Sequence, residues 1–205
     1  MAHKRLTAKG LSTTCAYLAS DPCLARIYAL YGTPPLWDRP PGFATLLQII
    51  LEQQVSLASA KACFDKLAAQ LGDVSPENLL SLTDAELKAI GFSRQKTSYA
   101  RYLAEAVLDH RIDLDNLDRL HDAEVKVELV KLKGVGEWTS DIYLLMALLR
   151  PDVMPKGDIA LHSAWSLVSG EPRPGPEEFL KIAERWRPHR STAARLLWHF
   201  YLSKR

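Results

Sequence analysis

The chain is poor in the residues that mark several classes of protein. Only three of its 205 residues are cysteines, and Cys15, Cys23 and Cys63 form neither a CxxC motif nor a Cys/His cluster. A disulfide framework, a zinc site and a four-cysteine iron–sulfur cluster are therefore disfavoured. No apolar run approaches the ~20 residues of a membrane-spanning helix, and residues 1–5 lead into mixed sequence rather than a signal-peptide core. We expect a soluble, intracellular protein.

Neither polarity nor charge is extreme. Hydrophobic residues make up 47% of the chain, charged residues 24%, and the formal net charge is only +2. A chain of this size and composition can bury roughly 70% of its unfolded surface, which excludes intrinsic disorder. The small net charge is weak support for a nucleic-acid partner, because phosphate binding depends on local clusters of lysine and arginine.

Strand-like alternation is scarce, and apolar residues recur at helical spacing along most of the chain. Short turns rich in glycine and proline separate the helical runs. Ser75, Thr83 and Gly175 stand at helix starts, with prolines or acidic residues after them. The sequence predicts an all-α protein of two helical lobes, with helices at 12–20, 22–31, 42–55, 57–71, 76–81, 84–89, 94–109, 122–131, 137–149, 159–169, 176–186 and 189–202.

Two glycines, Gly134 and Gly136, flank Val135 between two of these helices. They allow the chain to leave one helix, turn tightly and begin another. The backbone N–H groups at the start of that second helix, together with its dipole, favour an anion such as phosphate. Gly-Val-Gly alone favours an ordinary turn between helices. Leu132 before it and residues 138–139 after it favour a phosphate-binding hairpin.

The segment 132–140 (LKGVGEWTS), followed by 154–161 (MPKGDIAL), resembles the helix-hairpin-helix (HhH-GPD) DNA glycosylase superfamily, and most closely its 3-methyladenine branch. Residues 47–56, 91–99 and 186–199 are similar to the same branch, in the expected order. The resemblance implies a two-lobed helical fold with an active-site cleft between the lobes. It divides the chain into one lobe at 38–130 and a second built from 1–37 plus 131–205, which carries the hairpin.

Asp158 occupies the position of the family's catalytic acid, after the hairpin's second helix. It also suits a helix N-cap, because Ile159 and the residues after it are helical in pattern, and one side chain can fill both roles. Breaking a base–sugar bond develops positive charge on the deoxyribose. A carboxylate in a dry pocket stabilises that charge or orients an attacking water.

The resemblance also implies a mode of hydrolysis and a base pocket. In strand-cutting branches a lysine follows the second hairpin glycine by two residues, whereas here that position is Trp138, so we expect no Schiff base and no lyase activity. Trp138 and Trp198 fall at pocket positions, where an indole face suits a cationic alkylated base, although both also suit a core. A further pocket aromatic of some members is Ile142 here, with Tyr143 adjacent, which leaves the substrate range open.

By the same resemblance, residues 53–56 face the minor groove, and Gln54 fills the space left by the extruded nucleotide. Two solvated amides before a Ser56 N-cap are the plainer alternative. The DNA contacts expected from the family are Gln53, Gln54, Ser56, Lys133, Gly134, Val135, Gly136, Thr139, Arg190 and Ser191. The family often binds Na⁺ or K⁺ through hairpin carbonyls, here those of Val130, Leu132 and Val135. The chemistry itself requires no cofactor and no iron–sulfur cluster.

The distribution of charge is more informative than its total. Residues 181–205 contain seven lysines and arginines and a single acid, whereas residues 105–128 contain eight acids and three basic residues. We expect the basic C-terminal region to lie beside the hairpin on a surface that binds DNA, and the acidic segment to face away.

These features predict a monomeric monofunctional DNA N-glycosylase that acts on double-stranded DNA containing alkylated purines, chiefly 3-methyladenine, with 7-methylguanine as a second candidate base. It would be cytoplasmic, associated with the nucleoid in a bacterium or nuclear in a eukaryote, with no membrane partner. Two alternatives stay open: the same fold acting on hypoxanthine, ethenoadenine or uracil, and a non-catalytic module that uses the hairpin only to bind DNA. Asp158, the tryptophans and the Gln-Gln turn disfavour the module.

Overall fold

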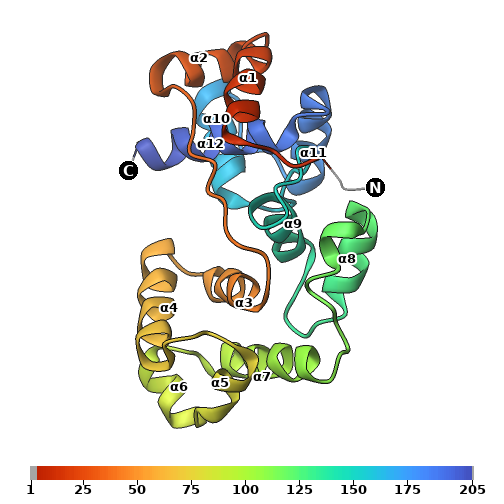
Figure 1. Ribbon diagram of the computed structural model, residues 1–205. Coiled ribbons are helices and arrows are strands. Elements are labelled where there is room, and N and C mark those ends of the chain that lie inside the picture. Colours follow the sequence, from red (N-terminus) through yellow and green to blue (C-terminus); the bar gives the residue numbers. More distant parts are fainter. Residues whose placement is uncertain (1–3, 205) are drawn as a thin grey trace. The chain divides into compact units, whose positions relative to one another are not determined.

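The computed structural model describes residues 4–204, and every regular element in that range is helical, which confirms the all-α prediction. None of these helices is long and apolar enough to cross a membrane. The elements are α1 (Ala8–Leu18), α2 (Pro22–Tyr31), α3 (Phe43–Glu52), α4 (Leu57–Leu71), α5 (Pro76–Ser81), α6 (Asp84–Ile90), α7 (Arg94–Leu108), η1 (Leu117–Arg119), α8 (Asp122–Val130), α9 (Glu137–Met146), α10 (Ile159–Ser169), α11 (Pro176–Ala183), η2 (Glu184–Trp186) and α12 (Arg190–Ser203) (Figure 1).

Side-chain caps fix most helix starts where the sequence predicts them. Asp21 accepts the backbone N–H of Cys23 at the start of α2, and Thr83 forms a reciprocal capping box with Glu86 at the start of α6. The first helix was predicted at 12–20, but α1 begins at Ala8 because the Thr7 side chain accepts the Gly10 N–H at 3.1 Å. The predicted helix 176–186 ends as an α-helix at Ala183 and continues as the 3-10 turn η2.

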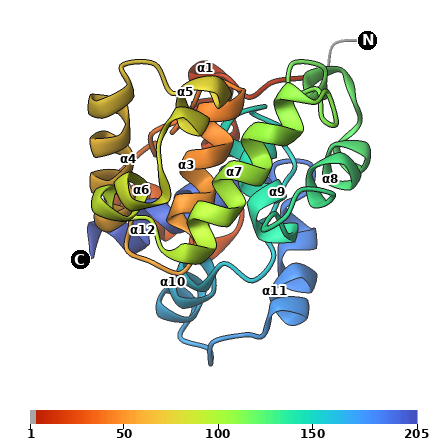
Figure 2. The same ribbon diagram turned by 90° about the horizontal axis from the view of Figure 1, so that it is seen from below.

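Residues 39–143 form the first of two structural units. Its central helix α3 is apolar on nearly every side, and Leu46, Leu47, Ile49 and Ile50 are fully buried. α4 and α7 pack against α3, and Figure 2 shows α7 running beside it. A helix that is apolar all round is suited to the centre of a core, and α3 holds this unit together.

Within the described chain, the second unit combines residues 4–38 with residues 144–204. Its central helix is α12, which packs against α1, α2 and α10 (Figure 1). Trp186 is buried and donates its indole N–H to Asp21 at 3.0 Å, which joins the end of η2 to the start of α2. The N-terminal helices therefore complete a core that the C-terminal helices begin.

The chain passes from the first unit into the later part of the second between Tyr143 and Leu144, whereas the sequence-based division placed this boundary near residue 130. The hairpin groups with the first unit for a physical reason. Gln53, at the end of α3, donates to the carbonyl of Gly134, and Lys126 of α8 forms an ion pair with the buried Asp141 of α9. These bonds attach the hairpin and the first turns of α9 to the first unit.

Candidate active site

Asp158 stands at the start of α10 in the second unit, as its predicted capping role requires. Gly157 has φ +75°, a conformation that favours glycine, and turns the chain into the helix. Asp158 Oδ1 accepts the backbone N–H of Leu161 at 3.0 Å and the indole N–H of Trp198 at 3.3 Å. The residue is only 7% exposed. Two donors on different helices therefore hold this carboxyl group in one orientation within a largely dry environment.

Trp198 belongs to α12 and is 8% exposed, with its ring edge-on to Trp37 at a centroid distance of 6.4 Å. The structure thus brings Trp198 next to Asp158, in agreement with a place at the site. The sequence reasoning missed two details: the indole N–H is a hydrogen-bond partner of the acid, and Trp37 lies against the indole. Trp37 has φ +49°, which no sequence signal indicated.

Two residues expected in the base pocket are buried in α9. Tyr143 is fully buried, and its hydroxyl accepts the backbone N–H of Gly42 at 2.8 Å, just before α3. Burial raises the pKa of this phenol to about 12. Ile142 is 2% exposed. Both side chains are enclosed in the protein interior, and a pocket-lining role for them stays a prediction. Trp138 is half-buried at the start of α9 and remains a pocket candidate.

The hairpin between α8 and α9 has the glycine geometry that the sequence predicts. Gly134 has φ +84°, and a Cβ atom there would lie 2.2 Å from the ring of Tyr99. Backbone sterics and packing therefore both require glycine at this position. Val135 is buried and donates its N–H to the carbonyl of Leu132 at 3.1 Å. Gly136 accepts from the backbone of Ser140 at 3.0 Å, which begins the α9 hydrogen-bond ladder.

Gln53 and Thr139 form hydrogen bonds that stabilise the hairpin. Gln53 Nε2 donates to the Gly134 carbonyl at 2.9 Å and to Thr139 Oγ1 at 2.8 Å. Thr139 is only 2% exposed. The Thr139 hydroxyl is enclosed with the Gln53 amide, and the DNA contact expected of Thr139 stays a prediction. The first of the two glutamines is an internal clamp.

Gln54 is the opposite case. It has φ +56°, unusual for a residue other than glycine, and its side chain is exposed between α3 and α4. Ser56 caps α4 by accepting the Ser59 N–H at 3.2 Å. Val55 and Leu57, beside it, are 44% and 56% exposed. The turn after Gln53 therefore projects an amide and two apolar side chains into solvent, a composition that suits insertion between bases.

A sequence profile described as "HhH-GPD superfamily base excision DNA repair protein" matches residues 47–188. The chain belongs to this superfamily. DNA-3-methyladenine glycosylase 1 of Schizosaccharomyces pombe is 26% identical over 180 residues, which cover 85% of this chain and 79% of the relative. A DNA-3-methyladenine glycosylase of Bacillus subtilis is 27% identical over 172 residues, or 78% of this chain and 57% of the relative. YfjP of the same bacterium is 25% identical, with 61% of its length covered.

Solved structures agree with the assignment to the HhH-GPD superfamily. The S. pombe 3-methyladenine DNA glycosylase Mag1, in complex with abasic DNA, superposes with a TM-score of 0.85 at 26% identity, covering 91% of this chain and 95% of Mag1. A DNA-3-methyladenine glycosidase from Bacillus halodurans gives a TM-score of 0.75 at 27% identity, covering 97% and 91%. The all-α fold is therefore the fold of this superfamily.

Three further residues of this HhH-GPD protein were predicted to contact DNA. Lys133 is exposed in the hairpin, and its amine donates to Ser98 Oγ at 2.9 Å, so its charge stays at the surface. Ser191 is fully buried and donates its hydroxyl to the Arg150 carbonyl at 2.6 Å. Arg190 forms ion pairs with Asp152 at 2.8 Å and Glu184 at 3.0 Å. Both side chains are bound within the second unit, and their contacts with DNA stay predictions.

The basic C-terminal region presents less charge to solvent than its sequence indicates. Arg195 is fully buried and donates to the carbonyls of Leu36 and Leu145, each at 2.8 Å. Burial lowers the pKa of this guanidinium to about 10. Arg187, like Arg190, pairs with Asp152 and Glu184. The simple count of basic residues therefore overstates the positive surface of this region, because one cation is internal and two are neutralised.

Proposed function

We propose that this HhH-GPD protein is a monofunctional DNA N-glycosylase that removes alkylated purines, chiefly 3-methyladenine, from double-stranded DNA and leaves an abasic site. The observation that carries the proposal is the placement of Asp158, a mostly buried carboxyl group at the start of α10, oriented by Leu161 and Trp198. The names of the S. pombe and B. subtilis relatives support the substrate class.

Asp158 acts on the deoxyribose rather than on the base. As the base departs, the sugar approaches an oxocarbenium ion, and a preorganised carboxylate stabilises that charge without reorganising at the moment of reaction. The same carboxylate accepts a hydrogen bond from the water that attacks the sugar. The Trp198 N–H and the Leu161 N–H hold the acid, so that it does not have to be ordered when DNA binds.

Trp138 supports hydrolysis without strand cleavage. A lyase reaction needs an amine that attacks the sugar and forms a Schiff base. The position two residues after the second hairpin glycine carries Trp138 in this chain, and an indole cannot form that bond. Its half-buried ring suits a cationic alkylated base, whose positive charge is attracted to the indole face and which is also a good leaving group.

The hairpin holds the DNA backbone. The α9 N-terminus follows Gly136, where a Cβ atom would meet nothing within 4 Å, so a phosphate can approach the backbone closely. Lys133 adds a cation at the surface of the same turn. Gln54 occupies the projecting turn that enters the space left by the extruded nucleotide, which lowers the free energy of flipping.

The hairpin carbonyls also suit an alkali cation. Val130, Leu132 and Val135 would supply the ligands, and a carbonyl oxygen has two acceptor sites, so Leu132 can bind a cation while it accepts the Val135 N–H. Such a cation would bring positive charge to the phosphate-binding turn. No group of three or more His, Cys, Asp or Glu side chains among residues 4–204 could form a different metal site.

Replacement of the acid tests the proposal most directly. Asn is isosteric with Asp and an equally good N-cap, so Asp158→Asn preserves the start of α10. We expect it to lower the rate of base release from methylated duplex DNA by about 100-fold or more, as loss of one transition-state contact does in other enzymes. DNA affinity stays near that of the wild type. Near-normal base release by Asp158→Asn would overturn the assignment.

The substrate class is tested by chromatography of the released bases. Duplexes alkylated with methylating agents and duplexes containing hypoxanthine, ethenoadenine or uracil are incubated with the wild-type protein, and Asp158→Asn serves as the inactive control. Release of 3-methyladenine is expected. Exclusive release of a deaminated base would assign the protein a different substrate class. Binding of DNA without release of any base would indicate a non-catalytic module. Because the substrate is genomic DNA, we place the protein in the nucleoid of a bacterium or the nucleus of a eukaryote.

A further inference from the structure

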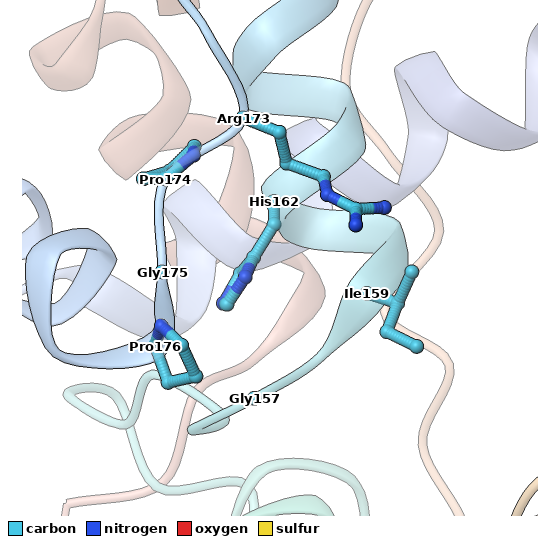
Figure 3. A pocket seen from close by; sticks show the side chains of 7 residues that line it. All are labelled: Gly157, Ile159, His162, Arg173, Pro174, Gly175 and Pro176. Carbon is cyan, nitrogen blue, oxygen red and sulfur yellow. The ribbon is translucent and has the colours of Figure 1, made fainter.

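A hollow of about 330 Å³ lies beside the turn that carries Asp158. Its walls come from two parts of the second unit: Gly157, Ile159 and His162 at the start of α10, and residues 173–176 of the connection to α11 (Figure 3). A Cβ atom at Gly157 or at Gly175 would meet nothing within 4 Å. The space is therefore open between two glycine-containing turns.

His162 is the buried polar side chain of this hollow. It is 5% exposed, its ring packs against Phe179 at a centroid distance of 4.8 Å, and Figure 3 shows the ring pointing between the two turns. Burial lowers the pKa of His162, and a hydrogen bond to Pro174 opposes this shift; since proline has no N–H, its carbonyl accepts. The other ring nitrogen, Nε2, is buried with no partner among residues 4–204. A native structure rarely leaves such an atom without a ligand or water.

Arg173 supplies a cation at the same hollow. Its side chain is exposed, and no ion pair joins it to an acid of the described chain. Two acids that follow Arg173 in the same connection have other partners: Glu177 pairs with Lys156 at 2.9 Å, and Glu178 accepts the Gly175 N–H at 3.3 Å. Arg173 is also close enough to His162 to lower its pKa. An arginine with no ion-paired acid, at the same hollow as a histidine whose Nε2 has no partner, is an arrangement that an anion would complete.

We propose that the hollow formed by His162 and Arg173 binds a phosphodiester of the damaged DNA strand next to the extruded nucleotide. This inference rests on the proposed function for the identity of the strand. Arg173 donates to the phosphate oxygens, and protonated His162 donates from Nε2.

The position of the hollow determines which phosphate of the damaged strand it can bind. Gly157 and Ile159 are the chain neighbours of Asp158, and neighbouring Cα atoms are about 3.8 Å apart. A phosphate between these turns therefore lies within one or two nucleotides of the sugar that Asp158 contacts. Held there, it sets the distance between that sugar and the carboxylate. Arg173 and His162 are positioning residues in this scheme, and Asp158 remains the catalytic residue.

Fluorescence anisotropy with a duplex that contains a tetrahydrofuran abasic analogue tests the Arg173 contact. We expect Arg173→Gln to weaken binding about tenfold and to lower the slope of log Kd against log salt concentration by about one, as loss of one phosphate contact does. Arg173→Lys keeps most of the slope. Arg26→Gln removes the same charge from an exposed arginine of α2 outside the hollow and serves as the control. Equal Kd and slope for Arg173→Gln and Arg26→Gln would overturn the proposal.

Single methylphosphonate substitutions locate the phosphate. Each flanking phosphate of the abasic analogue is neutralised in turn, and binding is compared between the wild type and Arg173→Gln. At one adjacent position the neutral linkage is expected to weaken the wild type about tenfold and the variant less than twofold, because two groups that interact are not additive. Equal penalties for both proteins at every position would show that Arg173 holds no particular phosphate.

Proton uptake tests the contribution of His162. Burial and Arg173 lower its pKa in the free protein, whereas Asp158 and the bond to Pro174 raise it; Phe179, on α11, adds no charge. A phosphate would raise the pKa, so calorimetry in two buffers of different ionisation enthalpy should show proton uptake by the wild type at pH 7. His162→Gln should abolish most of this uptake. Unchanged uptake would remove His162 from the site.

These tests are independent of base release. If Arg173→Gln has the expected effect and the wild type releases no base, the phosphate site stands and the glycosylase proposal fails. If base is released normally and neither Arg173→Gln nor the methylphosphonates show the expected pattern, the glycosylase proposal stands and the phosphate site fails. Arg173 is exposed, so its substitution leaves the fold intact and the result interpretable.

Discussion

The two glycine turns that begin α9 and α10 have similar backbones and different tasks. Gly134 has φ +84° and Gly157 has φ +75°. The first turn ends at Gly136, a residue without a side chain, so an external anion can approach the helix N-terminus. The second ends at Asp158, whose own carboxyl group caps α10. The first turn keeps the N-terminus of α9 accessible to a ligand, whereas the second places the proposed catalytic acid at the N-terminus of α10.

Replacing each of the two positive-φ glycines by alanine should separate packing from backbone strain. At Gly134 the new Cβ lies 2.2 Å from Tyr99, whereas at Gly157 nothing lies within 4 Å. We expect Gly134→Ala to lower the free energy of unfolding by about 3 kcal/mol, from strain and overpacking together. Gly157→Ala should lower it by about 1 kcal/mol, from strain alone. Urea denaturation measures both.

The double variant Gly134→Ala/Tyr99→Ala is the control for the collision. Removing the ring gives the alanine methyl group space, so the two substitutions together should destabilise less than the sum of their separate effects. Strict additivity, or equal losses at Gly134 and Gly157, would show that the two turns do not differ in packing.

The clamp from Gln53 to the hairpin should have a smaller effect. Gln53→Ala removes two hydrogen bonds and leaves the Gly134 carbonyl and Thr139 hydroxyl without that donor, so we expect a loss of about 1–2 kcal/mol in the free energy of unfolding. Gln54→Ala, the exposed neighbour, should change stability by less than about 0.5 kcal/mol. DNA affinity should show the opposite order, with Gln54→Ala weakening binding more than Gln53→Ala does. A large loss of stability in Gln54→Ala would contradict the projection of this side chain into solvent.

The smallest effect concerns pH and the second turn. The pKa of His162 is lowered from its ordinary value of 6.5 by burial. The unfolded chain therefore binds a proton more readily, and the free energy of unfolding should fall as the pH drops below about 6.5. His162→Gln should reduce this dependence between pH 7.5 and pH 5.5, measured by thermal unfolding. An identical pH dependence in both proteins would show that His162 is not a buried neutral histidine.

Features that depend on nearby residues were predictable from the sequence. The bounds of α2, α4, α5 and α10 agree with those predicted, because caps and glycines mark their ends. Asp158 was predictable for the same reason, since a capping position is a local pattern. The family resemblance then added the chemistry that local patterns do not contain.

Features that depend on distant partners were not predictable. Gln53 and Gln54 are chemically identical neighbours, yet one is bound to the hairpin and the other is exposed. Ser191 and Arg195 differ from solvent-facing residues only through backbone carbonyls far along the chain. His162 could have been found, because it follows Asp158 by four residues and shares its face of α10.

The origin of the second unit from both ends of the chain bears on the order of its synthesis. All residues of the first unit leave the ribosome before α10, α11 and α12, and domains tend to fold as they emerge. The helices α1 and α2 must wait for α12, and Asp158 receives the Trp198 hydrogen bond only after residue 198 has been synthesised. A nascent or prematurely terminated chain can therefore have a folded hairpin while its carboxyl group is still unassembled.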